Sequence, residues 1–224
     1  MGCAMAQPIV IAHHLIWTLY GWWLPNDPRG SCSRTIGCNL LEPLGDLHYG
    51  RKKLQPASRD IRAFYEQARA VLKHPLLELR GSAIISVGRG FEDAITKCGY
   101  TCYACAVLFD HIHLIIRKHK HDAEEMIEQF QHFSRLRLST EGFREPNHPV
   151  WCRGGWKIFL DHPDEIRRTI KYVDDNPLPY RMPRQRWDFV TEYDNWPLHE
   201  GHSMKSPYVK RLIAAGRYPR DRKC

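Results

Sequence analysis

The sequence predicts an α+β fold: a ferredoxin-like antiparallel sheet on a β-α-β-β-α-β core, with an additional C-terminal helix. Three observations predict it. Apolar runs rich in β-branched and aromatic residues recur along the chain, and amphipathic segments with helical spacing separate most of them. Two of these runs are separated only by Phe109-Asp110. So short a connection predicts a hairpin of antiparallel strands.

The first half of the chain predicts one strand and two helices around a long insertion. Residues 8–20 (PIVIAHHLIWTLY) have the composition of a strand. Residues 21–58 are rich in Gly and Pro, and a loop of this length in a compact domain is either functional or disordered. Apolar residues at helical spacing predict helices over 59–73 and 82–97.

The second half completes the pattern. Residues 101–108 and 111–118 predict the two strands of the hairpin, and 156–160 (WKIFL) predicts a short strand. An amphipathic helix is expected over 122–139, where Asp122 and Glu125 have capping-box spacing.

A last helix is expected to begin at Asp161 or Pro163. It should end near Asn176, because the residue before Pro177 is disfavoured in helical geometry. We expect a catalytic domain over 1–190, with 21–58 as its insertion, and a basic C-terminal tail over 191–224.

Composition limits the classes of function. The 224 residues include 33 Lys and Arg against 25 Asp and Glu, which gives a formal net charge of +8. A basic chain of this kind favours an anionic partner, nucleic acid above all. The eight cysteines are irregularly spaced in a chain that is not small, which favours reduced thiols and a cytoplasmic location. The N-terminal segment lacks the charge pattern of a signal peptide, and no stretch is apolar enough for a membrane span.

Two short segments carry the expected chemistry. His111-Ile112-His113 sets two imidazoles on one face of a strand, and Tyr172 and Asn176 lie four apart on a helix, also on one face. Two imidazoles and an amide oxygen could hold a metal beside a phenol, an arrangement suited to attack on a phosphodiester. A second His-x-His pair, His119-Lys120-His121, lies in a polar context typical of a solvated turn. Taken singly, each motif also fits a structural role.

Together, FDHIHLIIR, PVWCRGGWKIFL and RRTIKYVDDNPL resemble the Y1 (IS200-like) transposase family of the HUH endonuclease superfamily. They look most like the REP-associated tyrosine transposases, and YGWWLPNDPRGS also resembles a subset of these proteins. The resemblance covers about residues 8–190. It implies that His111 and His113 bind a metal and that Tyr172 is the nucleophile. Asn176 matches the position of the third ligand, where insertion-sequence members usually have glutamine.

The resemblance also implies the reaction and its partners. It implies a metal-dependent endonuclease and strand transferase that acts on single-stranded DNA near a hairpin, through a 5′-phosphotyrosine intermediate. The family works with Mg²⁺ or Mn²⁺, although imidazole ligands favour softer ions. We expect a monomer or a homodimer without a membrane partner.

DNA binding should combine basic side chains with aromatic stacking surfaces. The basic candidates are Arg51, Lys52, Lys53, Arg117, Lys118, Lys120, Arg167, Arg168, Lys171, Arg181, Arg184 and Arg186, and the aromatic ones are Trp22, Trp23, Trp151 and Trp187. About half of them should prove to be solvated charges or core aromatics.

Two alternatives stay open. Cys98, Cys102 and Cys105 have the C-x3-C-x2-C spacing of radical SAM iron–sulfur enzymes, although too few residues follow for the barrel of that class. The other alternative is a domesticated DNA-binding protein that keeps the fold without the chemistry.

Overall fold

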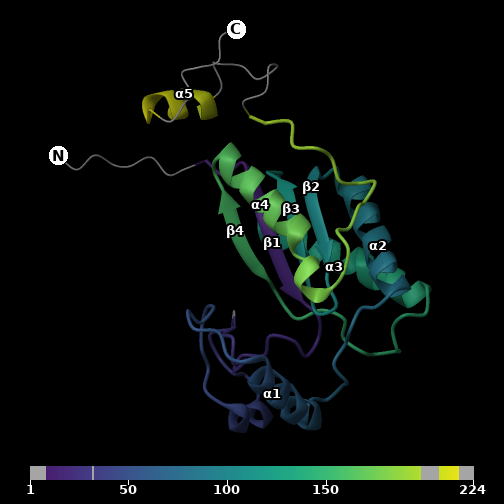
Figure 1. The fold of residues 1–224 in the computed structure, drawn as a ribbon. Helices are drawn as coiled ribbons and strands as arrows, with labels where there is room; N and C mark the ends of the chain where they lie inside the picture. Colours follow the sequence, from purple (N-terminus) through teal and green to yellow (C-terminus); the bar gives the residue numbers. More distant parts are fainter. Residues whose placement is uncertain (1–8, 32, 198–206, 217–224) are drawn as a thin grey trace, which may run out of the picture.

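The protein is built around a four-stranded antiparallel sheet with the strand order β2-β3-β1-β4 (Figure 1). The computed structural model describes residues 9–31, 33–197 and 207–216. The strands are β1 (Ala12–Thr18), β2 (Cys102–Val107), β3 (His111–Arg117) and β4 (Trp156–Leu160). This order, with β1 between β3 and β4, is that of a ferredoxin-like sheet, and it confirms the predicted fold class.

The strand β1 is shorter than the expected segment 8–20. Its ladder with β3 extends from Ala12 to Thr18 and its ladder with β4 from Ala12 to Ile16, and beyond them Leu19 forms an isolated bridge with Trp151. Gly21 then turns the chain with φ at +84°, a conformation that favours glycine. Composition located the strand, but pairing with its partner strands sets its ends.

Helices α2 (Ser82–Cys98) and α3 (Ala123–Thr140) cover one face of the sheet. The core on this side includes Trp17, Phe91 and Phe130, which are at most 2% exposed. The two helices pack closely at Gly90, where a Cβ atom would lie 2.4 Å from the Cα atom of Ser134. The predicted capping box of α3 is present.

Helix α4 (Pro163–Asp175) crosses the other face, where Ile166 and Val173 pack against Ile115 (Figure 1). The helix begins at Pro163 after the N-cap residue His162, and Asn176 is its C-cap residue. The 3-10 helix η2 (Leu178–Tyr180) follows directly.

The C-terminal tail contains a helix that the sequence did not predict. Helix α5 (Pro207–Ala214) places Val209 and Leu212 against the same core cluster as α4. Within 191–224, residues 198–206 and 217–224 lie outside the described residues.

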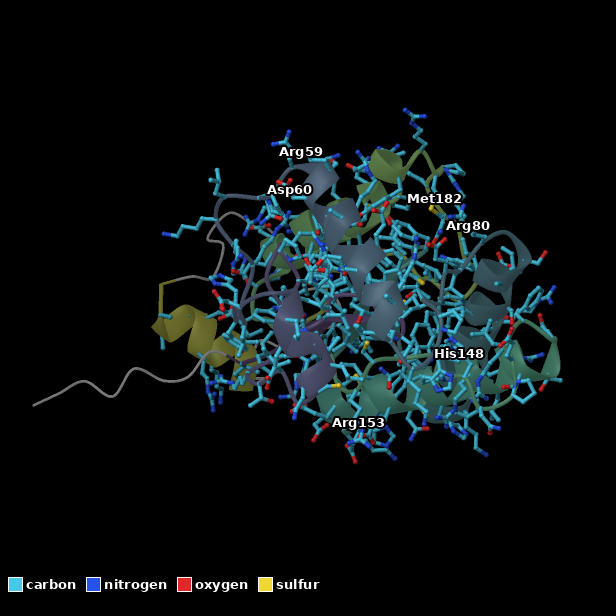
Figure 2. All side chains as sticks on the ribbon, turned by 90° about the horizontal axis from the view of Figure 1, so that it is seen from below. Arg59, Asp60, Arg80, His148, Arg153 and Met182 are labelled. Atoms are coloured by element: carbon cyan, nitrogen blue, oxygen red, sulfur yellow. The ribbon has the colours of Figure 1, made fainter. Side chains whose placement is uncertain are left out.

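The insertion is folded rather than extended. It contains the 3-10 helix η1 (Asn39–Leu44), and helix α1 (Ser58–Val71) follows it. A buried ion pair organises its first part: Arg29 Nη2 lies 2.8 Å from Asp27 Oδ2, and Tyr65 of α1 donates a hydrogen bond to the same carboxylate. Figure 2 views the molecule from this end, with Arg59 at the start of α1 exposed to solvent. No helix in the described ranges is long and apolar enough to cross a membrane.

Candidate active site

Three histidines meet on the sheet face that α4 crosses. His111 and His113 alternate with the core residues Ile112 and Leu114 along β3, so both point away from α2 and α3. The ring centroids of His111 and His113 are 4.9 Å apart. His14 of the neighbouring strand β1 joins them, with its Nε2 atom 2.9 Å from His113 Nδ1.

The Nδ1 atom of each β3 histidine has a partner. His111 Nδ1 lies 2.6 Å from Oδ1 of Asp110, a carboxylate that is 1% exposed, and His113 Nδ1 pairs with His14. This leaves Nε2 as the ring nitrogen that each residue can offer to a ligand. Metal-binding histidines commonly have such a partner on the other nitrogen, which fixes the tautomer and the ring orientation.

Burial keeps the imidazoles of His113 and His14 neutral. It lowers the pKa of His113 well below its usual value, and the neighbouring His111 and His14 lower it further. Burial also lowers the pKa of His14 to about 4. Neutral His14 can therefore accept a hydrogen bond from His113 Nδ1–H, the tautomer in which His113 Nε2 carries a free lone pair.

Tyr172 lies over these histidines from α4. Its ring centroid is 5.6 Å from that of His113 and 6.1 Å from that of His14, with nearly perpendicular ring planes. The residue is nevertheless 50% exposed. The structure thus brings together Tyr172, His111 and His113, and leaves the phenol accessible to a substrate.

Asn176 lies one helical turn after Tyr172. Beyond it, the ring of Tyr180 is 6.2 Å from His111 and 5.4 Å from Phe109. The segment from Tyr172 to Tyr180 therefore follows β3 from His113 towards His111, and Asn176 belongs to this segment. Asn176 is the C-cap residue of α4, and its role as a metal ligand stays a prediction.

The donor set fits a metal in part. The described part of the chain contains no group of three or more His, Cys, Asp or Glu side chains arranged to hold a metal ion. The Nε2 atoms of His111 and His113 are donors that could take two coordination positions. Further positions would need the amide oxygen of Asn176, water or a substrate oxygen, which are donors that Mg²⁺ and Mn²⁺ accept.

The basic candidates have different surroundings. Lys171 forms an ion pair of 2.8 Å with Asp175, which Arg184 also contacts at 2.6 Å. Arg117 lies 4.2 Å above the ring of Trp196. The remaining exposed or partly exposed candidates are Arg51, Lys52, Lys53, Lys118, Lys120, Arg167, Arg168, Arg181 and Arg186.

Of the tryptophan candidates, Trp22 is buried and the other three are partly buried against the core. Trp22 is 8% exposed and donates to the carbonyl of Leu77, Trp151 packs on Trp17, and Trp187 fills the space above Gly88. Burial of Trp22 does not fit a role in base stacking, whereas Trp151 and Trp187 are partly exposed and stay predictions. Trp23 is partly exposed, beneath the guanidinium of Arg29 at 3.9 Å.

Sequence reasoning missed His14 and Asp110 as members of the site. Asp110 adjoins His111 in the motif, and this adjacency was the available signal for a carboxylate partner. His14 is one of two adjacent histidines on β1, and only the strand pairing shows which of them faces His113. Its partner is 99 positions away in the sequence.

The cysteine alternative does not fit the structure. Cys102 and Cys105 are 0% and 4% exposed within β2, and burial raises the pKa of both thiols. Buried thiols of raised pKa are poor metal ligands, since the thiolate is the binding form. Cys98 lies at the end of α2 as a free cysteine.

Comparisons with known proteins found several similar solved structures, two of which are described here. The first is a REP-associated tyrosine transposase bound to a REP hairpin, with 13% identity, a TM-score of 0.41, and coverage of 98% of this chain and 89% of that chain. The second, from Deinococcus radiodurans R1, is provisionally described as a transposase, with 12% identity, a TM-score of 0.36, and coverage of 78% and 97%. No family model and no curated protein matches the chain. The first structure comes from the family that the sequence motifs resemble.

Proposed function

We propose that the protein is a metal-dependent endonuclease and strand transferase for single-stranded DNA near hairpins, as in DNA transposition. One observation carries the proposal: the half-exposed phenol of Tyr172 lies against His113, whose neighbour His111 is held by a buried carboxylate. An accessible phenol and a pair of imidazole donors thus lie together on one sheet face, which supports the proposal.

The chain's own residues perform the covalent step. The oxygen of Tyr172 attacks the phosphorus, and the bond from phosphorus to the 3′ oxygen breaks as the phosphotyrosine bond forms. The phenolic proton is lost and the departing 3′ oxygen gains one, so the products are a 5′-phosphotyrosine and a free 3′-hydroxyl. The reverse attack by a 3′-hydroxyl rejoins DNA without an external energy source, because the covalent link conserves the phosphodiester energy.

His111 and His113 would hold the metal through Nε2, with Asn176 as the third protein ligand. A bound divalent ion supplies polarisation of the scissile phosphate and stabilises the developing negative charge. Asp110 orients His111, and His14 orients His113. The lysines and arginines around the face would bind the flanking phosphates.

The direct test is a search for a covalent protein–DNA adduct. Full-length protein, Mn²⁺ and a hairpin oligonucleotide with single-stranded flanks should give an adduct that migrates slowly on a denaturing gel. Tyr172→Phe should remove the adduct and leave DNA binding nearly unchanged, because only the hydroxyl is lost. Excess EDTA should remove it from the wild type.

Tyr180 provides the matched control. It is 40% exposed and its ring lies beside His111, yet it belongs to η2 rather than α4. Tyr180→Phe should retain the adduct. An adduct that maps to Tyr180, or one that persists in EDTA, would contradict the proposal. Tight DNA binding with no adduct from the wild type would instead identify a DNA-binding protein without the chemistry.

A further inference from the structure

The insertion and β4 together present an aromatic surface beside the candidate site. Residues paired directly across adjacent strands share a face of the sheet, and Ile16 of β1 pairs with both His113 and Trp156. Trp156 therefore lies in the same cross-strand row as His113, on the same face. Two strand spacings separate the two residues, or about 10 Å.

Tyr49 of the insertion extends this surface. Its ring centroid lies 6.2 Å from that of Trp156 with an interplanar angle of 38°, and Tyr49 is 49% exposed. The guanidinium of Arg34 lies 4.6 Å from the centroid of Tyr49. Two aromatic rings and a cation thus meet beside the row that contains His113.

The backbone of the insertion fixes the position of Tyr49. Ser31 N–H donates to the carbonyl of His48 at 2.9 Å, and Gly50 N–H donates to the carbonyl of Ser31 at 2.7 Å. Gly30 permits this close approach, since a Cβ atom there would lie 1.9 Å from the Gly50 oxygen. An aromatic ring held half-exposed on a fixed ribbon loses little conformational entropy when a ligand stacks on it.

We propose that Tyr49 and Trp156 form a stacking site for an unpaired base of the DNA strand whose backbone reaches His113. The inference rests on the proposed function and adds a role for the insertion. A base is the favoured occupant because aromatic rings stack on its faces while nearby cations neutralise phosphates. Arg51, Lys52 and Lys53 directly follow the ribbon and supply those cations. The exposed Ile158, two residues after Trp156 on the same face, continues the apolar surface.

The proposal predicts that replacing Tyr49 removes the contribution of a single base to the affinity for DNA. All measurements use full-length protein with Tyr172→Phe, so that covalent capture does not obscure binding. A hairpin with a fluorescently labelled single-stranded tail reports binding by anisotropy. Tyr49→Leu should weaken binding by about 5- to 150-fold, the range for loss of one stacked base. Tyr49→Phe keeps the ring and should bind like the parent.

An abasic scan of the tail identifies the stacked base. In the parent, removal of the base at one position should weaken binding as strongly as Tyr49→Leu does. In Tyr49→Leu, removal of that base should have no further effect. Phe143 is an exposed aromatic after the end of α3, at 39% exposure, and Phe143→Leu is the matched control that should bind normally.

Binding by Tyr49→Leu within about twofold of the parent, or an equal loss at every abasic position, would overturn the proposal. Trp156→Leu should show the same position-specific loss. Since Trp156 belongs to the sheet, the loop variant Tyr49→Leu is the decisive one. The adduct assay with wild-type protein is independent: an adduct without a stacked base rejects only the stacking site, and a stacked base without an adduct rejects only the proposed chemistry.

Discussion

Two His-x-His pairs lie in different surroundings on the same molecule. The rings of His111 and His113 have centroids 4.9 Å apart, and those of His119 and His121 are 4.7 Å apart. Each pair also has a tyrosine beside it. Tyr172 contacts the first pair and is 50% exposed, whereas Tyr100 contacts the second pair and is 5% exposed.

The partners of the two pairs differ more than their spacing. The Tyr100 hydroxyl is bonded to His121 Nδ1 at 2.8 Å, and burial raises the pKa of Tyr100. Among the described residues, the Nδ1 atoms of this pair have partners other than a carboxylate: His119 Nδ1 accepts from the backbone N–H of His121. The comparison shows that the two-residue spacing alone does not make a site. A buried carboxylate and an accessible phenol distinguish the first pair.

The largest expected effect is on formation of the covalent adduct, and it distinguishes the two His-x-His pairs directly. His111→Ala and His113→Ala should each remove the covalent adduct, since each loses a proposed metal ligand. The loss of adduct should exceed the 10- to 100-fold loss that is typical when a residue hydrogen-bonded to a metal ligand is replaced. His119→Ala and His121→Ala should retain it, as measured by adduct yield at saturating Mn²⁺. Equal loss from both pairs would remove the distinction drawn between them.

Replacement of the Asp110 carboxylate should have the next largest effect. Asp110→Asn keeps the size of the side chain but removes the charge that orients His111, so the Mn²⁺ concentration for half-maximal cleavage should rise about 10- to 100-fold. Tyr100→Phe, which removes the bond to His121, is the control and should leave this concentration unchanged. An unchanged metal requirement in Asp110→Asn would show that Asp110 serves the fold alone.

A smaller effect is expected at Asn176. Water can replace an amide oxygen as a ligand, so Asn176→Ala should cleave more weakly than the wild type but retain activity at high Mn²⁺. Rates measured across a Mn²⁺ titration test this expectation. Complete loss at every concentration would make Asn176 as important as the histidines.

The smallest effect concerns His13, which precedes His14 on β1 and points to the opposite face. Burial and the charge of Lys118 lower the pKa of His13. Below the usual pKa of histidine, the unfolded chain therefore binds more protons than the folded chain, and stability falls as the pH falls. His13→Leu should make urea-unfolding midpoints less sensitive to pH between neutrality and mild acid, with adduct formation unchanged. An undiminished pH dependence would contradict this role.

The sequence predicted the elements well because their signals are local. The capping box at Asp122 and the stop before Pro177 depend on neighbouring residues, and the structure has both. The choice of Tyr172, His111 and His113 also came from local motifs, and the structure brings these three together.

Other features depend on distant pairing and could not be predicted in this way. Register places His14 beside His113 and Trp156 in the row of His113. The tryptophans proposed as DNA-stacking residues were chosen by residue type, which does not distinguish a surface ring from a core ring, and Trp22 proved to be in the core. Tyr49 lies in a loop, where periodicity carries no information.

The central position of β1 has a consequence for the order of folding. This strand is made before the other three, but its neighbours β3 and β4 come from much later in the chain, and His14 is 99 positions from its hydrogen-bonding partner. Contacts so distant in sequence form slowly, because the chain must close a large loop first. During synthesis, β1 cannot pair until the hairpin of β2 and β3 has been made, and Tyr172 is made after the last strand, β4. A ribosome-bound chain would therefore have no assembled site until almost the whole domain has emerged.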